Sequence, residues 1–546
     1  MNAKNLIRFT AILFFVLISF FCSQKKPEVL PQQMTKFNLL SEEADLLYDR
    51  GSYTSLKQAY SIYKNLQTYP DFQNRTLKKL AKTALLLAIR ENELFIIGDE
   101  YLIKALDLIG SYPELSDFSS YAAIVIFSSK RGTGITRRGL NGQYNREEYT
   151  QWTKKNIVQL NADLKDKAET DVFYAYFYLS LNAEFPYHIS KEDDFTRFST
   201  IFPNSPLIRY KLSVFPKFDQ KRIEVLLQGD PEFYEAYFFL GDKALNLGST
   251  LTAEKNLLQA YEQIPASISV LTLLTQIHFL LEEFDLSLMY NENILVLAPE
   301  YRDSLLGKAI CLGYLGRHEE ALDILNTLIE LGMYLMGESH YWLAWNYHET
   351  GQLESAWENI RRASNYLVGH FEVHSLAGII AFDRAEIEAS EDQFKKALWM
   401  NQDDCEASFY MGKILGLRNE WEQSGINFER AALCNAGMEN ALKDKIKEIE
   451  TSTFNPSRKQ KYLTKKRIQM KKVQVAKATS FYNAAAGYFN VGQNEKALEL
   501  ALSAKDSKTL LPRVEELIDK IKNKINLEYS RLLLDKTLEN VQTQFY

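Results

Sequence analysis

The chain has 546 residues, of which 46% are hydrophobic and 25% are charged. These proportions are typical of folded globular proteins, and the length exceeds that of one compact domain. The formal net charge of −6 excludes a general electrostatic affinity for nucleic acid.

Residues 1–22 have the composition of an export signal. Lys4 and Arg8 form a basic start, and an apolar run of 13 residues follows, which is too short for an ordinary membrane span. A polar linker at 23–38 comes next. We therefore expect the protein to be exported.

The apolar run ends at Cys22, and this order of apolar run, cysteine and polar linker resembles the signal of bacterial lipoproteins. The resemblance implies that Cys22 is lipidated and anchors the protein in a membrane, on the periplasmic side of the envelope or at the cell surface. Phe21 departs from the small residue that usually precedes the lipidated cysteine. An ordinary secretory signal and an uncleaved anchor are the alternatives.

Residues 39–230 repeat a helical pattern only weakly, for example in Leu47, Ala59 and Tyr63. We expect diverged helical repeats in this part of the chain, interrupted by a flexible basic insertion at 118–146. The insertion contains glycines and no acid, and it lacks the Gly-Lys-Ser/Thr ending of a phosphate-binding loop.

A clearer pattern recurs six times between residues 234 and 438, with a period of 34 or 35 residues. Small residues at positions 8 and 20 of each unit indicate two helices that cross closely, and glycine at position 15 indicates the turn between them. The predicted starts of the units are Tyr234, Ile268, Arg302, Gly337, Phe371 and Cys405. The pattern resembles the tetratricopeptide repeat, which implies an all-α, helix–turn–helix solenoid wound into a right-handed superhelix.

The chain continues with a strongly basic stretch. Residues 451–494 contain nine basic residues and no acid. We expect a basic helical connector at 439–477 and a seventh unit at 478–511. The connector would contact an anionic membrane surface or an acidic partner, or it is simply a solvated helix face packed on the solenoid.

A final helix is expected at 512–546. Its apolar residues fall on one side, as a helix that caps the last repeat requires. They are Val514, Leu517, Ile518, Ile521 and Ile525.

The resemblance also implies a binding groove, because the first helices of tetratricopeptide units line a concave face. The aromatic residues at the groove positions are Phe238, Phe279, Tyr314, Tyr341, Trp345, Phe382 and Phe409. The acidic ones are Glu235, Asp242, Asp303, Glu338, Glu372 and Glu406. Such a groove suits a peptide that carries Lys or Arg beside apolar side chains. Alternatively, the acids stabilise helix N-termini and some of the aromatic residues pack between units.

Cysteines and histidines give no sign of catalysis. Besides Cys22 there are Cys311, Cys405 and Cys434, and we expect a chain that does not depend on disulfides, although a bridge between Cys405 and Cys434 is left open. The order His370-Phe-Glu-Val-His374 is not the metalloprotease motif. We therefore expect no metal, no cofactor and no enzymatic activity.

The sequence predicts a non-catalytic scaffold at the cell envelope. It would bind a protein or peptide partner through its concave groove, bind the membrane through a lipid anchor, and bind no nucleic acid. One alternative is a surface-exposed adhesin-like lipoprotein. Another is an enzyme domain hidden in residues 72–230, which a compact fold there would favour.

Overall fold

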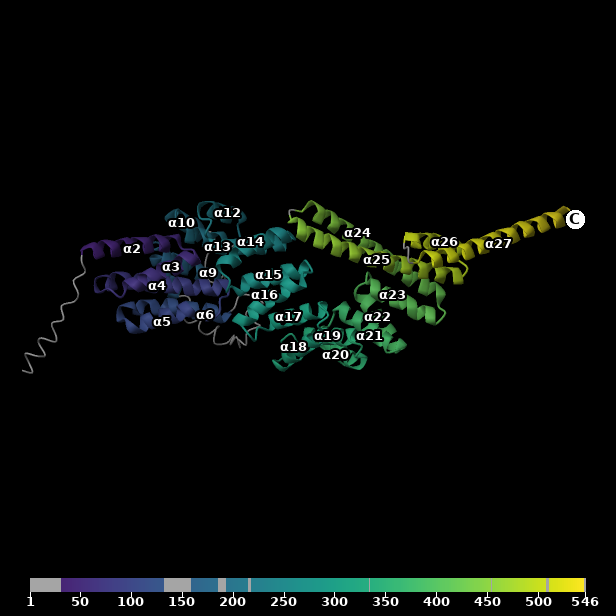
Figure 1. The fold of residues 1–546 in the computed structure, drawn as a ribbon, viewed down its shortest axis with the longest axis horizontal. Coiled ribbons are helices and arrows are strands. Elements are labelled where there is room, and N and C mark those ends of the chain that lie inside the picture. The colour runs from purple at the N-terminus through teal and green to yellow at the C-terminus, as the bar shows by residue number, and fades with distance from the viewer. Residues whose placement is uncertain are drawn as a thin grey trace, which may run out of the picture. The chain divides into compact units, whose positions relative to one another are not determined.

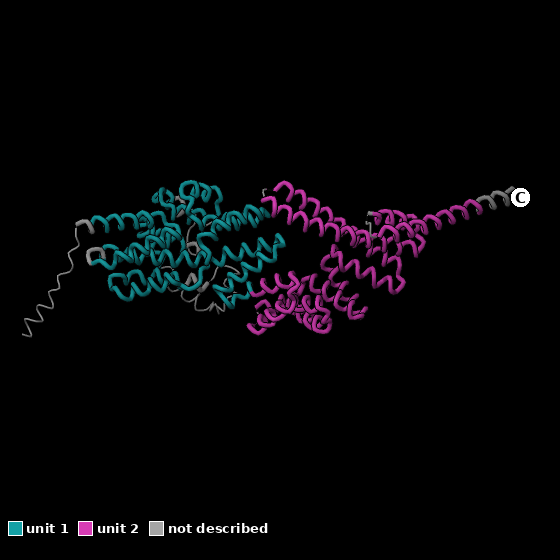
Figure 2. Tube along the Cα trace, viewed as in Figure 1, with its two compact units in different colours: residues 1–304 teal, residues 305–546 magenta. Residues whose placement is uncertain are grey.

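The computed structural model describes residues 31–131, 159–184, 193–214, 218–332, 334–452, 454–506 and 510–544, and Figure 1 shows their helices. Within these residues the chain forms helices and turns and no strand. It divides into two compact units, residues 1–304 and 305–546 (Figure 2). The signal segment with Cys22 and residues 132–146 of the expected insertion lie outside the described residues.

The first unit is built around a central helix, α4. The helices before the six repeats are α2 (Pro31–Arg50), α3 (Tyr53–Leu66), α4 (Pro70–Leu94), α5 (Glu100–Ser111), the 3-10 turn η1 (Pro113–Phe118), α6 (Ser119–Arg131), α9 (Val172–Glu184), α10 (Asp193–Ile201), α11 (Pro206–Val214) and α12 (Gln220–Gly229). Residues 83–91 of α4 are buried all round, because α3, α5, α6 and α15 (Ile268–Leu280) surround this helix. An amphipathic surface helix buries only one stripe.

The prediction of a flexible insertion at 118–146 is wrong for its first half, since residues 119–131 form α6. Tyr121, Ala122, Ile124 and Val125 are at most 4% exposed and belong to the same core as α4. The apolar face they form explains why this stretch is helical despite its basic end.

Six helix pairs follow in chain order. They are α13 (Tyr234–Asn246) with α14 (Thr250–Gln263), α15 with α16 (Phe284–Leu297), α17 (Arg302–Tyr314) with α18 (His318–Glu330), α19 (Met336–Glu349) with α20 (Leu353–Tyr366), α21 (Phe371–Asp383) with α22 (Ile387–Met400), and α23 (Cys405–Leu417) with α24 (Trp421–Thr451). Each first helix starts within one residue of the start that the period predicts. The fold is an all-α solenoid of tetratricopeptide type, which confirms the predicted fold class.

Close crossing of the two helices explains the small residues at positions 8 and 20. A Cβ atom added to Gly412 would lie 2.8 Å from Phe428 Cγ, and one added to Gly378 would lie 2.6 Å from Phe394 Cε1. Where position 20 is serine, its hydroxyl bridges the crossing, and Ser390 Oγ donates to the carbonyl of Gly378 at 2.8 Å.

The turn inside each pair needs a left-handed residue at position 15. Glycines supply it in three of the six pairs, for example Gly351 with φ of +75°. In the other three pairs Glu282, Ala385 and Asn419 adopt φ between +57° and +62°. The turn geometry is therefore kept even where the sequence offers no glycine.

The second unit ends in an arrangement that differs from the regular pairs. Helix α24 has 31 residues, whereas the preceding second helices have 13 or 14. Helix α25 (Pro456–Asn490) packs back along α24, so the basic connector expected at 439–477 takes the form of a helical hairpin (Figure 1).

Two further helices complete this unit, α26 (Asn494–Ser503) and α27 (Leu511–Gln544), with the short η2 (Ala504–Asp506) between them. Val514, Leu517, Ile518 and Ile521 of α27 pack in a core with α25 and α26, as a capping helix requires. From Leu527, which is 62% exposed, the helix runs on with exposed apolar residues. Only the first part of α27 therefore acts as a cap. Among the described residues, no helix combines the length and the apolar character that a membrane span needs.

Candidate peptide-binding face

The strongest candidate site lies on the first helices of the second unit, where aromatic rings gather. The ring centroids of Tyr314 and Trp345 are 5.5 Å apart, and those of Trp342 and Trp345 are 5.6 Å apart. Tyr341 contacts Trp342 edge-on at 5.3 Å. Tyr314 is 46% exposed and the other three rings are half-buried, so the cluster keeps an accessible aromatic surface.

Carboxylates contribute negative potential at one ring of this cluster, Tyr341. Burial raises the pKa of Tyr341 to about 12, and the charges of Tyr314, Glu372 and Glu406 act in the same direction. Glu372 and Glu406 are exposed residues at the starts of α21 and α23. Glu338, in the first turn of α19, is half-buried. The acidic side chains of two first helices, α21 and α23, thus act electrostatically on Tyr341 of a third first helix, α19.

A second aromatic patch already holds a cation. The rings of Phe382 and Tyr410 lie 5.1 Å apart, and Lys413 Nζ is 4.2 Å from the centroid of Phe382 and 4.6 Å from that of Tyr410. Burial lowers the pKa of Lys413, and Asp383 opposes this shift. In this patch an ammonium group lies against two aromatic rings, although burial disfavours its charged form.

Glu235 does not line the predicted groove in the structure. Its side chain is fully buried and forms an ion pair with Arg90 of α4, and one of its oxygens accepts a hydrogen bond from the backbone N–H of Tyr53. The prediction that Glu235 lines the groove is therefore wrong, because α4 covers this position in the first unit.

The remaining predicted residues of the first unit also contribute to packing. Phe238 contacts Phe239 edge-on at 5.0 Å, and Phe279 contacts Phe284 at 5.6 Å. Asp242 accepts a hydrogen bond from Asn246 at 3.4 Å, and burial raises its pKa. Asp303 is half-buried. These four residues are all half-buried, whereas the cluster around Trp345 includes the exposed ring of Tyr314.

Three residues of the face were not predicted, namely Trp342, Tyr410 and Lys413. Trp342 and Tyr410 both occupy position 6 of their units, next to the aromatic residue at position 5. Lys413 occupies position 9 of its unit, and the sequence pattern pointed only to acidic and aromatic residues as groove residues. Phe409, a predicted residue, packs edge-on against Phe428 of α24 at 5.3 Å and is half-buried.

Buried charges on α4, α9 and α11 form a network that also reaches α13 through the ion pair between Arg90 and Glu235. Lys211 Nζ lies 2.6 Å from Glu93, which also accepts a hydrogen bond from Tyr176 OH at 2.6 Å. Arg90 Nε lies 3.2 Å from Glu93, and the Arg90 side chain is fully buried. These ionisable groups pair with one another inside the core, so the network holds α4, α9 and α11 together.

His374, and His340 at the same position of the preceding unit, form structural hydrogen bonds, whereas His370 is the N-cap residue of α21 and makes no side-chain cap hydrogen bond. His340 Nδ1 lies 2.8 Å from Asn359 Oδ1, and His374 Nδ1 lies 2.8 Å from Gln393 Oε1. Each pair joins the first helix of a unit to the second helix of the same unit. Within the described part of the chain, no group of three or more His, Cys, Asp or Glu side chains is placed to hold a metal ion.

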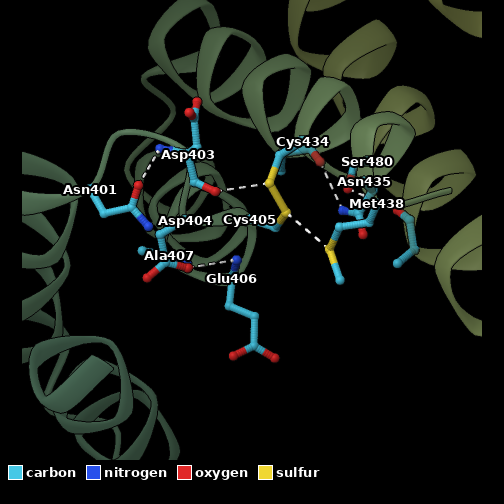
Figure 3. Close-up of a disulfide and its surroundings, with 12 residues drawn as sticks. Asn401, Asp403, Asp404, Cys405, Glu406, Ala407, Cys434, Asn435, Met438 and Ser480 are labelled. Carbon is cyan, nitrogen blue, oxygen red and sulfur yellow. Dashed lines mark hydrogen bonds between the residues drawn. A yellow bond between two sulfur atoms is a disulfide. The ribbon is translucent and has the colours of Figure 1, made fainter. Parts of the chain in front are cut away.

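Cys405 and Cys434 form a disulfide, with their Cα atoms 5.5 Å apart (Figure 3). The expectation of a chain without disulfides is therefore wrong. Cys405 begins α23 directly after its N-cap residue Asp404, and Cys434 lies in α24. The bond ties the two helices of the sixth unit at the point where α24 continues into the hairpin.

Comparisons with known proteins give similarity of fold only. No family model matches the chain, and no curated protein matches it. A tetratricopeptide repeat protein from Parabacteroides merdae is 12% identical, with 50% of this chain and 98% of that chain covered and a TM-score of 0.35. The type IV pilus biogenesis factor PilW is 18% identical, with 38% and 92% covered and a TM-score of 0.30. MamA from Desulfovibrio magneticus is 16% identical, with 31% and 96% covered and a TM-score of 0.29. Similarities at this level do not support a conclusion about family or function, and the fold assignment depends on the helix pairs themselves.

Proposed function

We propose that the protein is a non-catalytic scaffold that holds a protein or peptide partner on the first-helix face of residues 305–546. The observation that carries this proposal is the aromatic cluster around Trp345 beside the carboxylates of Glu372 and Glu406. Rigid aromatic rings give large contact area at a small entropy cost, and carboxylates favour Lys and Arg over acidic segments.

The proposed partner segment is extended or helical and carries basic residues next to apolar ones. The ammonium of Lys413 over Phe382 and Tyr410 supports this chemistry, because the protein's own lysine occupies such a site there. The cluster of Tyr314, Trp342 and Trp345 would receive the partner's cation or its apolar neighbour.

The proposal places the scaffold at the cell envelope, anchored through Cys22, with an envelope protein as its partner. The export-type N-terminus supports this location. The disulfide between Cys405 and Cys434 supports it independently, because disulfides persist in oxidising compartments outside the cytoplasm. A lipid anchor would keep the scaffold at the membrane surface, close to its partner.

In-cell photo-crosslinking tests the proposal. Probes replace Trp345 and Tyr314 on the face, and a control probe replaces the exposed Lys395 of the second helix α22. We expect one envelope protein to be captured from both face positions and not from position 395. Capture from position 395 alone, or from none of the three, would reject the proposed face.

Once the partner is known, its affinity for variants of the face measures how much each residue contributes to binding. We expect Trp345→Ala to weaken binding at least 30-fold, which is about 2 kcal/mol and typical of a central aromatic residue. Glu372→Gln should weaken binding a few-fold, mainly at low salt. Trp399→Ala is the matched control, since Trp399 is 82% exposed on α22 and should contribute nothing.

A further inference from the structure

The helical hairpin that follows the sixth unit has a charge opposite to that of the chain. We call residues 435–478, the end of α24 and most of α25, the basic arm. It contains twelve basic and four acidic residues, a formal charge of +8, whereas the whole chain carries −6. At 1.5 Å per residue, the 17 residues of α24 beyond Cys434 extend the helix by about 25 Å.

Acids of the arm pair with basic residues of the arm itself. Glu439 pairs with Lys477 at 2.7 Å and with Lys443 at 2.9 Å, and these lysines help to lower its pKa to about 2. Glu439 and Lys477 are nearly buried between the two helices. Glu450 pairs with Arg467 at 3.3 Å. The outer surface of α25 therefore keeps an excess of positive charge.

Exposed residues of α25 form one continuous stripe. They recur at helical spacing and include no acid, and they are Lys461, Thr464, Arg467, Ile468, Lys471, Lys472 and Val475. The opposite side of the helix packs on α24 through the buried residues Tyr462, Leu463 and Met470. Two aliphatic side chains interrupt the charges, with Ile468 52% and Val475 41% exposed. The stripe from Lys461 to Val475 is about 21 Å long.

We propose that this stripe of the basic arm binds an anionic phospholipid surface. A row of lysines on long flexible stems matches a fluid plane of phosphates, and each cation adds to binding without fixed geometry. Ile468 and Val475 would enter the headgroup region between the charges. The arm would orient the scaffold on the membrane. This proposal does not depend on the peptide-binding face.

A lipid surface explains the stripe better than an acidic protein does. A stable protein interface needs roughly 1,000 Å² of complementary surface with shaped features. A cavity of about 600 Å³ is lined by residues that include Asp403, Glu429, Cys434 and Gly437. It lies at the base of the arm beside the disulfide and not along the stripe.

Vesicle co-sedimentation of the full chain tests this inference. Phosphatidylcholine vesicles are compared with vesicles that also contain phosphatidylglycerol. The arm variant is the triple substitution Lys461→Gln, Lys471→Gln and Lys472→Gln. The control variant replaces Lys64, Lys243 and Lys255 by Gln, three exposed lysines of the first unit, so the change in net charge is equal. Residues 1–22 are the same in all chains, and their contribution cancels in the comparison.

We expect the arm variant to lose roughly 100-fold of the preference for phosphatidylglycerol, since each lysine near a charged surface contributes about fivefold. The control variant should stay close to the wild type. Equal losses in both variants, or no loss in the arm variant, would overturn the proposal. Protection of the arm lysines from acetylation in isolated envelopes, without binding to phosphatidylglycerol vesicles, would identify an acidic protein instead and also overturn it.

Discussion

Single residues at the same repeat position serve different purposes in this protein. Glu235, Glu372 and Glu406 all occupy position 2, yet Glu235 is fully buried against Arg90 whereas the other two are exposed. The difference arises because α4 covers the start of α13, and an ion pair compensates the buried charge. Repeat position alone therefore does not decide whether an acid can meet a partner.

Glu91 gives the first unit a pH-dependent stability. It is 3% exposed, and burial raises its pKa to about 7. Between pH 4.5 and pH 7 the folded state binds a proton that the unfolded state releases, so stability falls as the pH rises through this range. We expect Glu91→Gln to remove this dependence and to raise the free energy of unfolding above pH 7 by up to about 3 kcal/mol.

Urea unfolding of wild type and Glu91→Gln, followed by circular dichroism below and above this pH range, measures the effect. Glu43→Gln, an exposed glutamate of α2, is the control and should keep the pH dependence of the wild type. Equal pH dependence in wild type and Glu91→Gln would show that Glu91 does not titrate as its environment indicates.

Ala385 carries backbone strain at the turn between α21 and α22. Its φ is +62°, a conformation that costs an L-residue about 1 kcal/mol. Ala385→Gly should therefore raise the free energy of unfolding by up to about 1 kcal/mol, and Gly351→Ala, at the same position of the preceding unit, should lower it by a similar amount. Unfolding followed by tryptophan fluorescence gives both values. A loss of stability in Ala385→Gly would contradict this account.

The two helices of each repeat cross closely. A Cβ at position 412 would lie 2.8 Å from Phe428, and α24 cannot move away because α25 packs along it. We expect Gly412→Ala to cost about 1–3 kcal/mol of stability. The control is Gly437→Ala in α24, where the added Cβ meets nothing within 4 Å, and it should stabilise the helix by up to about 1 kcal/mol.

The disulfide fixes the start of α23 to α24, and its loss should act locally. Closing a loop of 29 residues contributes about 3.5 kcal/mol in the chain-entropy model. We expect reduction, or the pair Cys405→Ser and Cys434→Ser, to speed amide hydrogen exchange at the α23–α24 junction. Exchange in α15 should not change. A thiol assay under denaturing conditions provides the check, since reduction should release two additional thiols.

At the scale of the whole molecule, the two compact units have separate cores and need not unfold together. Five of the six tryptophans, at positions 342, 345, 357, 399 and 421, belong to residues 305–546, and only Trp152 belongs to the first unit. Tryptophan fluorescence therefore reports mainly on the second unit, whereas circular dichroism reports on both.

We expect the two signals to give different unfolding transitions in urea. Glu91→Gln should shift the circular dichroism transition above pH 7 and leave the fluorescence transition in place. A joint shift of both signals would mean that the units unfold as one cooperative body. Separate unfolding of two parts of a solenoid is physically reasonable, because each repeat contacts only its neighbours.

The sequence by itself determined the helix pairs, their period and their turns. These features depend on contacts within one repeat. The small residues at positions 8 and 20, which meet at the helix crossing, are only 12 residues apart in the chain, and the turn residue at position 15 lies between them. It also located Tyr314, Tyr341 and Trp345, because position within a repeat sets the face of a helix. Whether these residues bind a partner stays a prediction.

Only the tertiary structure decided which of the residues singled out in the sequence are buried, and which form ion pairs or a disulfide. Arg90 pairs with Glu235, 145 residues away in the chain, and Cys405 is bonded to Cys434 where α24 extends beyond the usual repeat length. Residues 83–91 of α4 are buried on all sides. None of these contacts has a repeat period, because each depends on packing between segments that are distant in the chain or irregular in length. For that reason the burial of Glu235 could not be predicted, whereas position within a repeat was enough to locate Tyr314, Tyr341 and Trp345.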